Sequence, residues 1–207
     1  MTIEAVLFDF YGVLTSSPWS TLASVGSGGD EAAVLAVLLG AYDTDGDHPW
    51  HRLERGELAF TDYLTEVTVL GEAAGITIDF SRAANADRRI DVNESMVGTV
   101  RRLRTDGYRT AVVTNNVREF SHGWRSLVPV EELFDVVVDS SDCGMRKPNP
   151  AVYHHTLALL GGIAPHRAVF LDDSPGNVAG ARAAGLHAIH VEDPATALAV
   201  LDDLLGR

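Results

Sequence analysis

The sequence predicts an α/β protein in which helices cover both faces of a parallel sheet, with a helical insertion near the start of the chain. From residue 94 onward, short continuous apolar runs alternate with amphipathic stretches of helical period, the pattern of a buried parallel sheet. Residues 16–93 show helical spacing and no strand-turn-strand unit. We therefore expect a core domain from residues 1–15 and 94–207 and a small helical cap domain from residues 16–93.

The first predicted strand, residues 6–8, carries Asp9 at its carboxyl end. Gly12 follows, and glycine tolerates the backbone angles of a tight turn. In open α/β sheets, functional groups gather at the carboxyl ends of the strands. Asp9 is therefore the first candidate for a functional side chain.

The predicted insertion begins with residues 16–30, a small and polar stretch typical of a flexible connection. A helix is predicted over residues 30–39, with Asp30 as its N-cap and Gly40 near its end. Helical spacing then resumes in the apolar residues Trp50, Leu53, Leu58, Phe60, Tyr63, Leu64, Val67 and Leu70.

The predicted core resumes with a helix from residue 94 that Gly107 stops. Strands and helices then alternate regularly. The predicted strands are residues 110–113, 134–138, 168–171 and 187–191, and the predicted helices are residues 117–127, 150–160, 176–184 and 194–205. This alternation predicts a flavodoxin-like or Rossmann-like three-layer core.

Composition narrows the classes of function. The chain has 16 Lys and Arg against 29 Asp and Glu, a net charge of −13, which argues against nucleic acid and anionic membranes as partners. The single cysteine, Cys143, cannot form an internal disulfide. We find no signal peptide and no apolar run long enough to span a bilayer, so we expect a cytoplasmic protein. The oligomeric state stays open.

Four predicted strand ends carry chemically capable side chains. They are Asp9, the Thr114–Asn116 run, Lys147 in the loop after the third core strand, and the pair Asp172–Asp173. Together they provide a nucleophilic or metal-binding carboxylate, a hydroxyl, an ammonium and a paired acidic site. These groups suit phosphoryl transfer, in which a carboxylate attacks phosphorus while a lysine and Mg²⁺ neutralise the phosphoryl oxygens.

The order of these motifs resembles the haloacid dehalogenase superfamily. The motifs are Asp9-x-Tyr11-Gly12-Val13, Thr114-Asn115-Asn116, Lys147-Pro148 and Leu171-Asp172-Asp173-Ser174-x-x-Asn177. The match spans the whole chain, with a helical cap between the first and second motifs. The runs at residues 8–15 and 171–178 resemble the phosphatase-like N-terminal domain of epoxide hydrolases.

The resemblance implies a role for each motif residue. Asp9 would form an aspartyl-phosphate, while Thr114 and Lys147 hold the phosphoryl group. Mg²⁺ would bind Asp9, the backbone carbonyl of Tyr11 and the acidic pair, with Asp173 as a direct ligand and Asp172 supporting it. The remaining implied substrate contacts are Phe10, Asn115 and Asn116. The implied partner is a small phosphorylated metabolite, which the cap would select; its identity cannot be read from the sequence.

Tyr11 departs from the pattern of the family's phosphatases, which usually carry a second Asp there as general acid and base. The backbone oxygen of Tyr11 can still bind a metal. Its phenol, with an ordinary pKa near 10, is a poor proton donor and acceptor at about pH 7. A weakly active or purely phospho-ligand-binding relative therefore remains an alternative.

A 2-haloacid dehalogenase is a second alternative, because that branch of the family does carry Tyr at this position. Three features argue against it. First, no Arg lies between Asp9 and Arg52 to bind a haloacid. Second, the fourth motif of that branch is rich in serine and asparagine with an Asp five residues on, whereas this chain has Asp172–Asp173 followed by Asn177. Third, a paired carboxylate implies a metal, which dehalogenation does not need.

The acidic run Asp43–Asp47, with Glu54 eleven residues after Asp43, resembles a calcium-binding EF-hand loop. The glycine expected at the sixth position is replaced by His48. We expect a solvated loop, and whether it binds an ion stays open. We also expect Trp50 in the core of the insertion and the charges of Arg52 and Glu54 in solvent.

Overall fold

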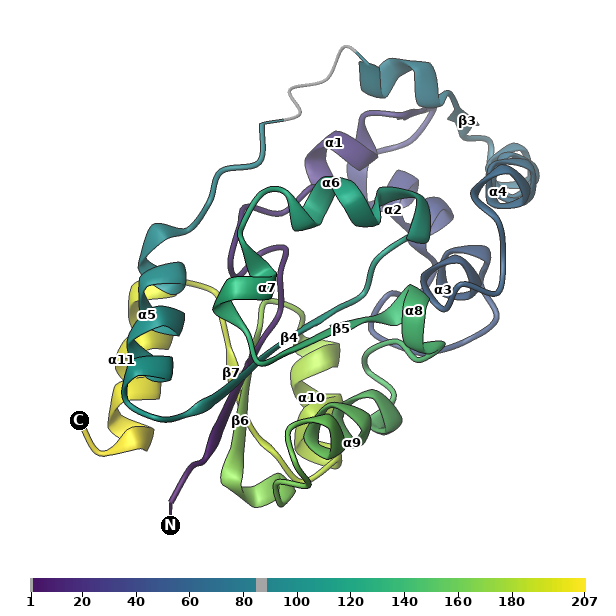
Figure 1. The fold of residues 1–207 in the computed structure, drawn as a ribbon. Coiled ribbons are helices and arrows are strands. Elements are labelled where there is room, and N and C mark those ends of the chain that lie inside the picture. Colours follow the sequence, from purple (N-terminus) through teal and green to yellow (C-terminus); the bar gives the residue numbers. More distant parts are fainter. Residues whose placement is uncertain (1, 85–88) are drawn as a thin grey trace.

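The main sheet has five parallel strands in the order β5-β4-β1-β6-β7 (Figure 1). The computed structural model describes residues 2–84 and 89–207. The strands are β1 Ala5–Phe8, β4 Arg109–Thr114, β5 Val136–Asp139, β6 Ala168–Asp172 and β7 His187–His190. Strand order proceeds outward from β1 in both directions, which is the Rossmann-like arrangement. The predicted α/β fold is confirmed.

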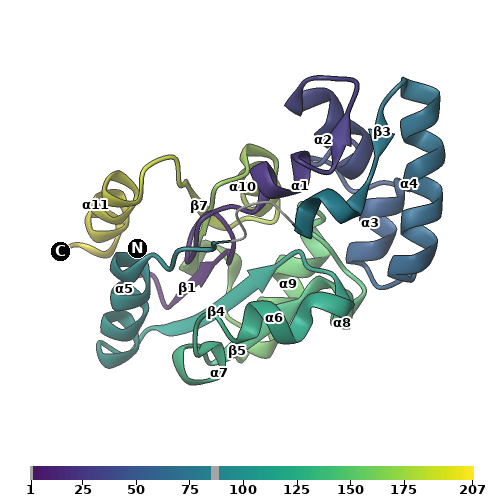
Figure 2. The same cartoon turned by 90° about the horizontal axis from the view of Figure 1, so that it is seen from above.

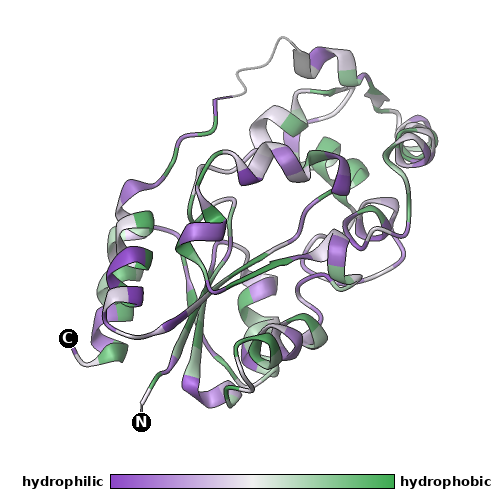
Figure 3. Cartoon of the chain, in the orientation of Figure 1, coloured by the Kyte–Doolittle hydropathy of each residue, from purple (hydrophilic) through white to green (hydrophobic). Residues whose placement is uncertain are grey.

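Helices cover both faces of this sheet (Figures 1 and 2). Helices α5 Glu94–Thr105, α7 Val130–Leu133 and α11 Pro194–Leu205 cover one face, and α9 Pro150–Leu159 and α10 Pro175–Ala183 cover the other. Successive β1 side chains alternate between the two cores, since Val6 and Phe8 join the first cluster and Ala5 and Leu7 the second. Figure 3 shows apolar stretches on the central strands, as burial on both faces requires.

The insertion is mainly helical and lies beyond the carboxyl ends of the strands (Figure 2). It contains α1 Trp19–Ala23, α2 Glu31–Leu39, α3 Pro49–Glu54, α4 Phe60–Ala74 and the 3₁₀ helix η1 Phe80–Ala84. Of the predicted range 16–93, residues 85–88 lie outside the described residues. The helices share a hydrophobic core that includes Leu38, Leu53 and Tyr63.

One expectation for the insertion was wrong. Residues 16–30 are not simply a connection, because they contain α1 and the short strand β2 Gly26–Ser27. β2 pairs antiparallel with β3 Thr77–Ile78, which lies far away in sequence, so the insertion contains a strand pair but this pair is not a strand-turn-strand unit. Strands of two residues are too short to show an alternating pattern, which is why the sequence did not indicate them.

Smaller differences occur in the core. The helix predicted over residues 117–127 is two short pieces, η2 Arg118–Phe120 and α6 Ser121–Arg125. The short helices α8 Ser140–Cys143 and η3 Pro165–Arg167 were not predicted. Within the described part of the chain, no helix combines the length and hydropathy needed to cross a bilayer.

A buried ion pair joins the insertion to the core. Arg146 Nε lies 2.7 Å from Glu54 Oε2, and both side chains are almost fully buried. The expectation that Glu54 is solvated was therefore wrong: its partner lies 92 residues away in sequence, a distance at which sequence patterns carry no pairing signal. Arg52 does lie near the surface, paired with Glu66, and Trp50 belongs to the insertion's hydrophobic core as expected.

Candidate active site

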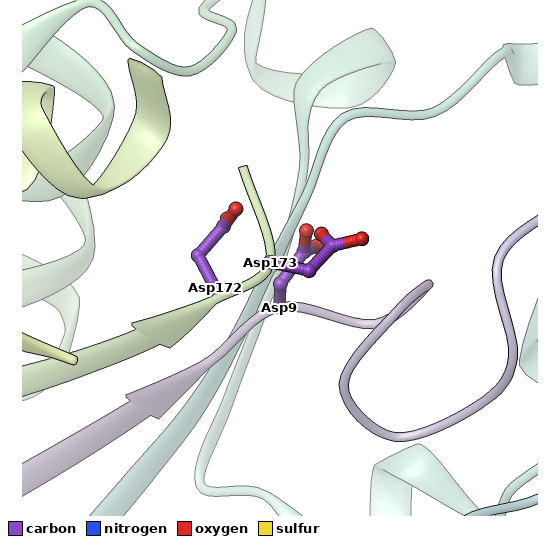
Figure 4. Close-up of side chains that lie close together, drawn as sticks. All are labelled: Asp9, Asp172 and Asp173. Atoms are coloured by element: carbon purple, nitrogen blue, oxygen red, sulfur yellow. The ribbon is translucent and has the colours of Figure 1, made fainter. Parts of the chain in front are cut away.

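The predicted strand-end residues converge at the carboxyl edge of the sheet. Asp9 follows β1, and its backbone N–H donates to the carbonyl of Leu171 in β6 at 2.9 Å. Thr114 ends β4, which also pairs with β1, while Asp172 ends β6. Because these three neighbouring strands are parallel, their last residues face the same space. Oxygens of Asp9, Asp172 and Asp173 lie within 4.8 Å of one another (Figure 4).

Lys147 bridges two of these carboxylates. Its Nζ lies 2.6 Å from Asp9 Oδ1 and 2.7 Å from Asp172 Oδ2, and its side chain is 1% exposed. The charges of Asp172 and Asp9 raise the pKa of Lys147 even though burial, the largest single influence, acts to lower it. The ammonium is therefore charged across the ordinary pH range.

Asn115 fixes the backbone that carries this lysine. Its amide Nδ2 donates to the carbonyl of Lys147 at 3.0 Å, and its Oδ1 accepts from the N–H of Lys147 at 2.8 Å. This reciprocal pair ties the loop after β5 to the end of β4. A residue that the resemblance implied as a substrate contact thus also positions Lys147.

Asp172 is fully engaged by the protein. Its Oδ1 accepts from the backbone N–H of Ser174 at 2.8 Å, and the side-chain amide of Asn177 donates to both carboxylate oxygens at 3.0 and 3.1 Å. With Lys147 on Oδ2, each oxygen has at least two partners. In Figure 4, Asp172 lies apart from the close pair formed by Asp9 and Asp173.

Asp9 is buried, with one oxygen held in place. Oδ1 accepts from the backbone N–H of Phe10 at 2.6 Å as well as from Lys147. Among the described residues, none donates a hydrogen bond to Oδ2, which leaves that oxygen for a ligand. Burial raises the pKa of Asp9 well above its ordinary value, the charge of Asp172 raises it further, and Lys147 opposes both.

Asp173 lies beside Asp9 and approaches the turn after β1. Burial, reinforced by the charge of Asp172, raises the pKa of Asp173 to about 6. A Cβ at Gly12 would lie only 2.0 Å from Asp173 Oδ2, and the φ of Gly12 is +80°. Glycine is therefore required at position 12 for both space and backbone conformation.

The donor set fits a hard divalent cation. Three carboxylates crowd around the ammonium of Lys147. Burial and the charge of Asp172 raise the pKa values of Asp9 and Asp173, and a bound cation would oppose both effects. Mg²⁺ prefers oxygen ligands, including carboxylates and backbone carbonyls. Asp9, Asp173 and the carbonyl of Tyr11 are the candidate ligands, with Asp172 held by protein donors behind them.

The site opens into a cavity of about 290 Å³, here called the acidic cavity. Its lining includes the predicted residues Asp9, Tyr11, Thr114, Asn115 and Asp173. Lys147 and Asp172 are buried directly behind this wall.

Phe10 and Asn116, which the resemblance implied as substrate contacts, do not line the acidic cavity. The side chain of Phe10 is buried in the core against Trp124, with ring centroids 4.9 Å apart, so Phe10 offers the site only its backbone. Asn116 is buried and donates its backbone N–H to Ser140 Oγ at 2.9 Å. It lines a neighbouring cavity rather than the acidic one.

Tyr11 is one of the residues that line the acidic cavity. The ring packs edge-on against Phe10 with centroids 5.1 Å apart. Burial raises the pKa of Tyr11 above its already high ordinary value, so the phenol stays neutral at pH 7.

The acidic cavity is also lined by residues that were not predicted to act in the site. They are Trp19, Tyr42 and Asp43 from the insertion and Ser174 and Pro175 after β6. Asp43 Oδ1 accepts from Ser174 Oγ at 2.9 Å and from the N–H of Gly176 at 3.1 Å. These contacts join residues more than 130 positions apart in sequence, so no local sequence pattern predicts them.

The acidic run at residues 43–47 is a loop in which Asp43, Thr44 and Asp47 are exposed, as expected, and its carboxylates have separate partners. Asp43 contacts the turn after β6, and Asp45 pairs with Arg55 at 2.5 Å and accepts from Asn149 Nδ2 at 3.0 Å. Glu54 pairs with Arg146. Within residues 2–84 and 89–207, the group of acidic side chains close enough to share a metal is Asp9, Asp172 and Asp173.

Comparisons with known proteins match this chain to one family. A family model described as haloacid dehalogenase-like hydrolase matches residues 3–185. The mouse acyl-CoA dehydrogenase family member 10 is 34% identical over 98% of this chain, and the mouse bifunctional epoxide hydrolase 2 is 29% identical over all of it. The chain spans only 19% and 39% of the lengths of these two relatives.

Two further matches extend over nearly the full length of both this chain and the matched protein. The sesquiterpene phosphatase astK of Aspergillus oryzae is 27% identical over 99% of this chain and 98% of its own length. A family enzyme from Bacteroides thetaiotaomicron, solved with magnesium and inorganic phosphate, has a TM-score of 0.63 and 19% identity over 92% of this chain and 96% of its own. The family match covers most of the sequence, and the solved structure shares the fold. This chain belongs to the haloacid dehalogenase-like hydrolase family.

Proposed function

We propose that this hydrolase is a magnesium-dependent phosphatase that cleaves phosphate monoesters by attack of Asp9 on phosphorus. One observation carries the proposal: Lys147 lies between Asp9 and Asp172, with Asp173 beside them, at the wall of a cavity. The arrangement provides a held nucleophile, a buried cation and a metal-binding carboxylate within a few ångströms. The phosphatase among the relatives supports it.

The proposed reaction has two displacements. Asp9 Oδ2 attacks phosphorus, and the bond from phosphorus to the ester oxygen breaks, giving an aspartyl-phosphate and an alkoxide that takes a proton to leave as the alcohol. Water then attacks the same phosphorus, which releases inorganic phosphate and restores the carboxylate. Lys147, with the hydroxyl of Thr114, balances the charge on the phosphoryl oxygens in both displacements.

Asp9, Asp173 and the backbone carbonyl of Tyr11 would hold Mg²⁺, and Asp172 would support them. The ion would neutralise charge on the phosphoryl group. The magnesium and phosphate in the solved relative support the proposal of a divalent cation, without bearing on which residues hold it. Asp172 would orient Lys147, because its own oxygens are already occupied by Ser174, Asn177 and the lysine itself.

Tyr11 sets the expected rate. A carboxylic acid at this position would donate a proton to the leaving group and accept one from water, and such assistance is typically worth about 10²–10⁴-fold. The neutral phenol of Tyr11 cannot accept a proton. We therefore propose an enzyme whose turnover is low and whose activated, good-leaving-group substrates react fastest. We further propose that residues 16–93 act as its cap and select the substrate.

The decisive measurement is hydrolysis of p-nitrophenyl phosphate by the purified protein, with Mg²⁺ and with EDTA. We expect turnover that requires Mg²⁺ and disappears in Asp9→Asn, because the amide cannot attack phosphorus. Mg²⁺-independent turnover, or turnover that survives in Asp9→Asn, would exclude the proposed mechanism.

Tyr11→Asp tests the acid–base argument separately. We expect a gain of about 10²-fold or more in kcat for substrates with poor leaving groups and a smaller gain for p-nitrophenyl phosphate, whose leaving group needs little protonation. No gain with either substrate would show that position 11 does not limit the reaction.

A 2-haloacid dehalogenase is the second candidate, favoured by one observation, the aromatic residue at position 11. It would release chloride from 2-chloropropionate without Mg²⁺. A relative that binds phosphate without turnover would bind Mg²⁺ and inorganic phosphate yet hydrolyse neither substrate. The same protein sample distinguishes the three outcomes.

A further inference from the structure

Two parts of the molecule line the acidic cavity. The sheet edge and its loops contribute Asp9, Tyr11, Thr114, Asn115, Asp173, Ser174 and Pro175, and the insertion contributes Trp19, Tyr42 and Asp43. The proposed reaction uses residues of the first group to hold the phosphate and the metal. The three insertion residues have no part in that task, so they are the candidates to contact the alcohol part of the substrate.

Asp43 is a carboxylate held in place at the wall of this cavity. Its Oδ1 accepts from Ser174 Oγ at 2.9 Å and from the N–H of Gly176 at 3.1 Å. A Cβ at Gly176 would lie only 2.5 Å from the Cβ of Asp43, so glycine leaves room for this approach. Among the described residues, none donates a hydrogen bond to Oδ2 of Asp43 and no cationic side chain forms an ion pair with it. Asp43 therefore offers the cavity an unbalanced negative charge.

Aromatic residues accompany this carboxylate. Trp19 and Tyr42 pack edge to face, with ring centroids 5.1 Å apart and an angle of 71° between the planes. The guanidinium of Arg146 lies over the ring of Tyr42, but Glu54 pairs with it at 2.7 Å, so the two charges cancel behind the cavity. The face of an aromatic ring attracts cations, most strongly in tryptophan.

The lining of the acidic cavity thus favours positive charge. It contains three carboxylates, and none of its residues within the described chain is a lysine, an arginine or a histidine. A bound phosphate and metal would involve Asp9 and Asp173, which leaves Asp43 without a counter-charge. A second anionic group on the substrate would be repelled by Asp43, and a neutral alcohol would leave that carboxylate unpaired.

We propose that the substrate is the phosphate monoester of a small amino alcohol, whose ammonium group binds between Asp43, Trp19 and Tyr42. The inference rests on the proposed phosphatase function, which places the phosphate at Asp9 and Lys147. A small alcohol is indicated because the cavity, at about 290 Å³, lies at the lower end of the range of about 300–1,000 Å³ for small-molecule sites. Primary and quaternary ammonium groups share the required chemistry.

A cationic alcohol also suits the side chain at position 11. An ammonium group two carbons from the ester oxygen withdraws electrons and stabilises the negative charge that this oxygen acquires as its bond to phosphorus breaks. The departing alkoxide therefore depends less on a proton donor. Such a substrate reduces the need for the general acid that Tyr11 does not provide.

The first test compares phosphocholine with 3,3-dimethylbutyl phosphate, which has carbon in place of nitrogen and hence the same shape without the charge. Both are measured as inhibitors of p-nitrophenyl phosphate hydrolysis. We expect the inhibition constant of phosphocholine to be lower by about tenfold, within the range of about two- to thirtyfold for a cation on aromatic rings. Equal constants, with p-nitrophenyl phosphate hydrolysed, would leave the phosphatase function standing and show the cation site to be wrong.

Phosphoethanolamine distinguishes the two kinds of ammonium group. Its primary ammonium can donate hydrogen bonds to Asp43, whereas the quaternary group of phosphocholine can contact only charge and rings. Tighter binding than 3,3-dimethylbutyl phosphate by either compound supports the proposal, and the tighter of the two identifies the class of alcohol. Binding of both no tighter than the neutral compound would overturn it.

Asp43→Asn should shift two values in opposite directions. Asparagine keeps an acceptor for Ser174 and Gly176 but loses the charge. We expect the inhibition constant of phosphocholine to rise by up to about fivefold and the KM of p-nitrophenyl phosphate to fall by up to about fivefold. A general loosening of the insertion would instead weaken both. The control is Asp203→Asn, which removes the same charge at an exposed position on α11 and should change neither value by more than about twofold.

Trp19→Leu and Trp19→Phe test the aromatic contact. Trp19→Leu should reduce the preference for phosphocholine over 3,3-dimethylbutyl phosphate by about threefold or more, while Trp19→Phe, which keeps a ring, should retain most of it. An unchanged preference in Trp19→Leu, or equal losses of affinity for both ligands, would contradict the proposed contact.

Calorimetry separates this proposal from the phosphatase function. If p-nitrophenyl phosphate is not hydrolysed, phosphocholine and 3,3-dimethylbutyl phosphate are titrated into the protein with Mg²⁺. A preference of about tenfold for phosphocholine that falls in Asp43→Asn would keep the cation site while the phosphatase function fails. The absence of any preference would overturn the cation site as well.

Discussion

Arg146 and Lys147 are consecutive, fully buried and paired with buried carboxylates, yet they serve different parts of the molecule. Arg146 points to the insertion. Its guanidinium binds Glu54 and the backbone carbonyls of Thr44 and Tyr42, and it lies over the ring of Tyr42. Lys147 points to the sheet edge and binds Asp9 and Asp172.

The difference lies in where the partners of each cation lie. Each guanidinium nitrogen of Arg146 has an acceptor in the insertion, so that pair is structural. The ammonium of Lys147 has three N–H donors, and carboxylates within the described chain occupy two of them. One of these carboxylates, Asp9, lines the acidic cavity, so Lys147 lies close to any ligand that binds there. Neighbouring buried ion pairs can thus have opposite functions, and each can be tested.

The largest effect on stability is expected from Arg146→Met. Removal of one partner leaves Glu54 buried without its counter-charge and strips two carbonyls of a donor, and such changes typically destabilise by about 3–5 kcal/mol. Urea unfolding would measure the loss.

The double variant Arg146→Met with Glu54→Gln is the control, because it removes both charges. It should recover part of that stability, since the uncompensated charge is gone. A single variant as stable as the wild type would show that the pair does not hold the insertion on the core.

Lys147→Met should lower activity more than it lowers stability, which is the reverse of the effect expected for Arg146→Met. We expect kcat for p-nitrophenyl phosphate to fall by about 10²–10³-fold, since a buried charge-stabilising donor is lost. The folded state loses less, because the remaining carboxylates can take up protons, as the raised pKa of Asp9 indicates. Activity and urea unfolding, measured on the same sample, separate the two effects. A stability loss equal to that of Arg146→Met, with activity retained, would make Lys147 a structural residue like its neighbour.

The stability of the protein should decrease in acid because His51, in the insertion, becomes protonated. Burial, together with the charges of Arg146 and His48, lowers the pKa of His51 to about 4 from 6.5, and its Nδ1 accepts from the N–H of Gly46 at 3.1 Å. The folded state thus favours neutral histidine, so the stabilisation is full above pH 6.5 and is lost as pH falls through about 4.

Thermal unfolding between pH 7 and pH 4 would measure this decline. His51→Gln should flatten it, and His154→Gln, at an exposed position, should not. An NMR titration adds a link to the ion pair: in Arg146→Met, the pKa of His51 should rise, because a lowering charge has been removed. If the pKa stays at about 4, Arg146 does not act on His51.

The sequence predicted the sheet edge far better than the insertion, for a physical reason. Asp9, Thr114 and Asp172 end strands whose apolar runs are visible locally, and parallel topology then brings strand ends together. The contacts of Glu54 with Arg146 and of Asp43 with Ser174 depend instead on how the insertion docks, which joins residues 92 and 131 positions apart. Likewise, the aromatic residues Phe60, Phe80 and Phe120 look like ordinary core residues in sequence. Only the fold shows that they line a cavity.

Asp43→Asn is expected to have the smallest effect on stability and activity. It tests whether Asp43 serves to dock the insertion on the core or to influence substrate binding. Asp43 faces the acidic cavity and also holds the turn after β6 through Ser174 and Gly176. Asparagine keeps an acceptor oxygen, so stability should change by less than about 1 kcal/mol. Removal of a negative charge from the mouth of an anion site should lower KM by up to about fivefold, because an exposed charge contributes at most about 1 kcal/mol, and the effect should shrink at high salt. A fall in kcat with KM unchanged would instead assign Asp43 a part in proton transfer, the task that Tyr11 cannot perform.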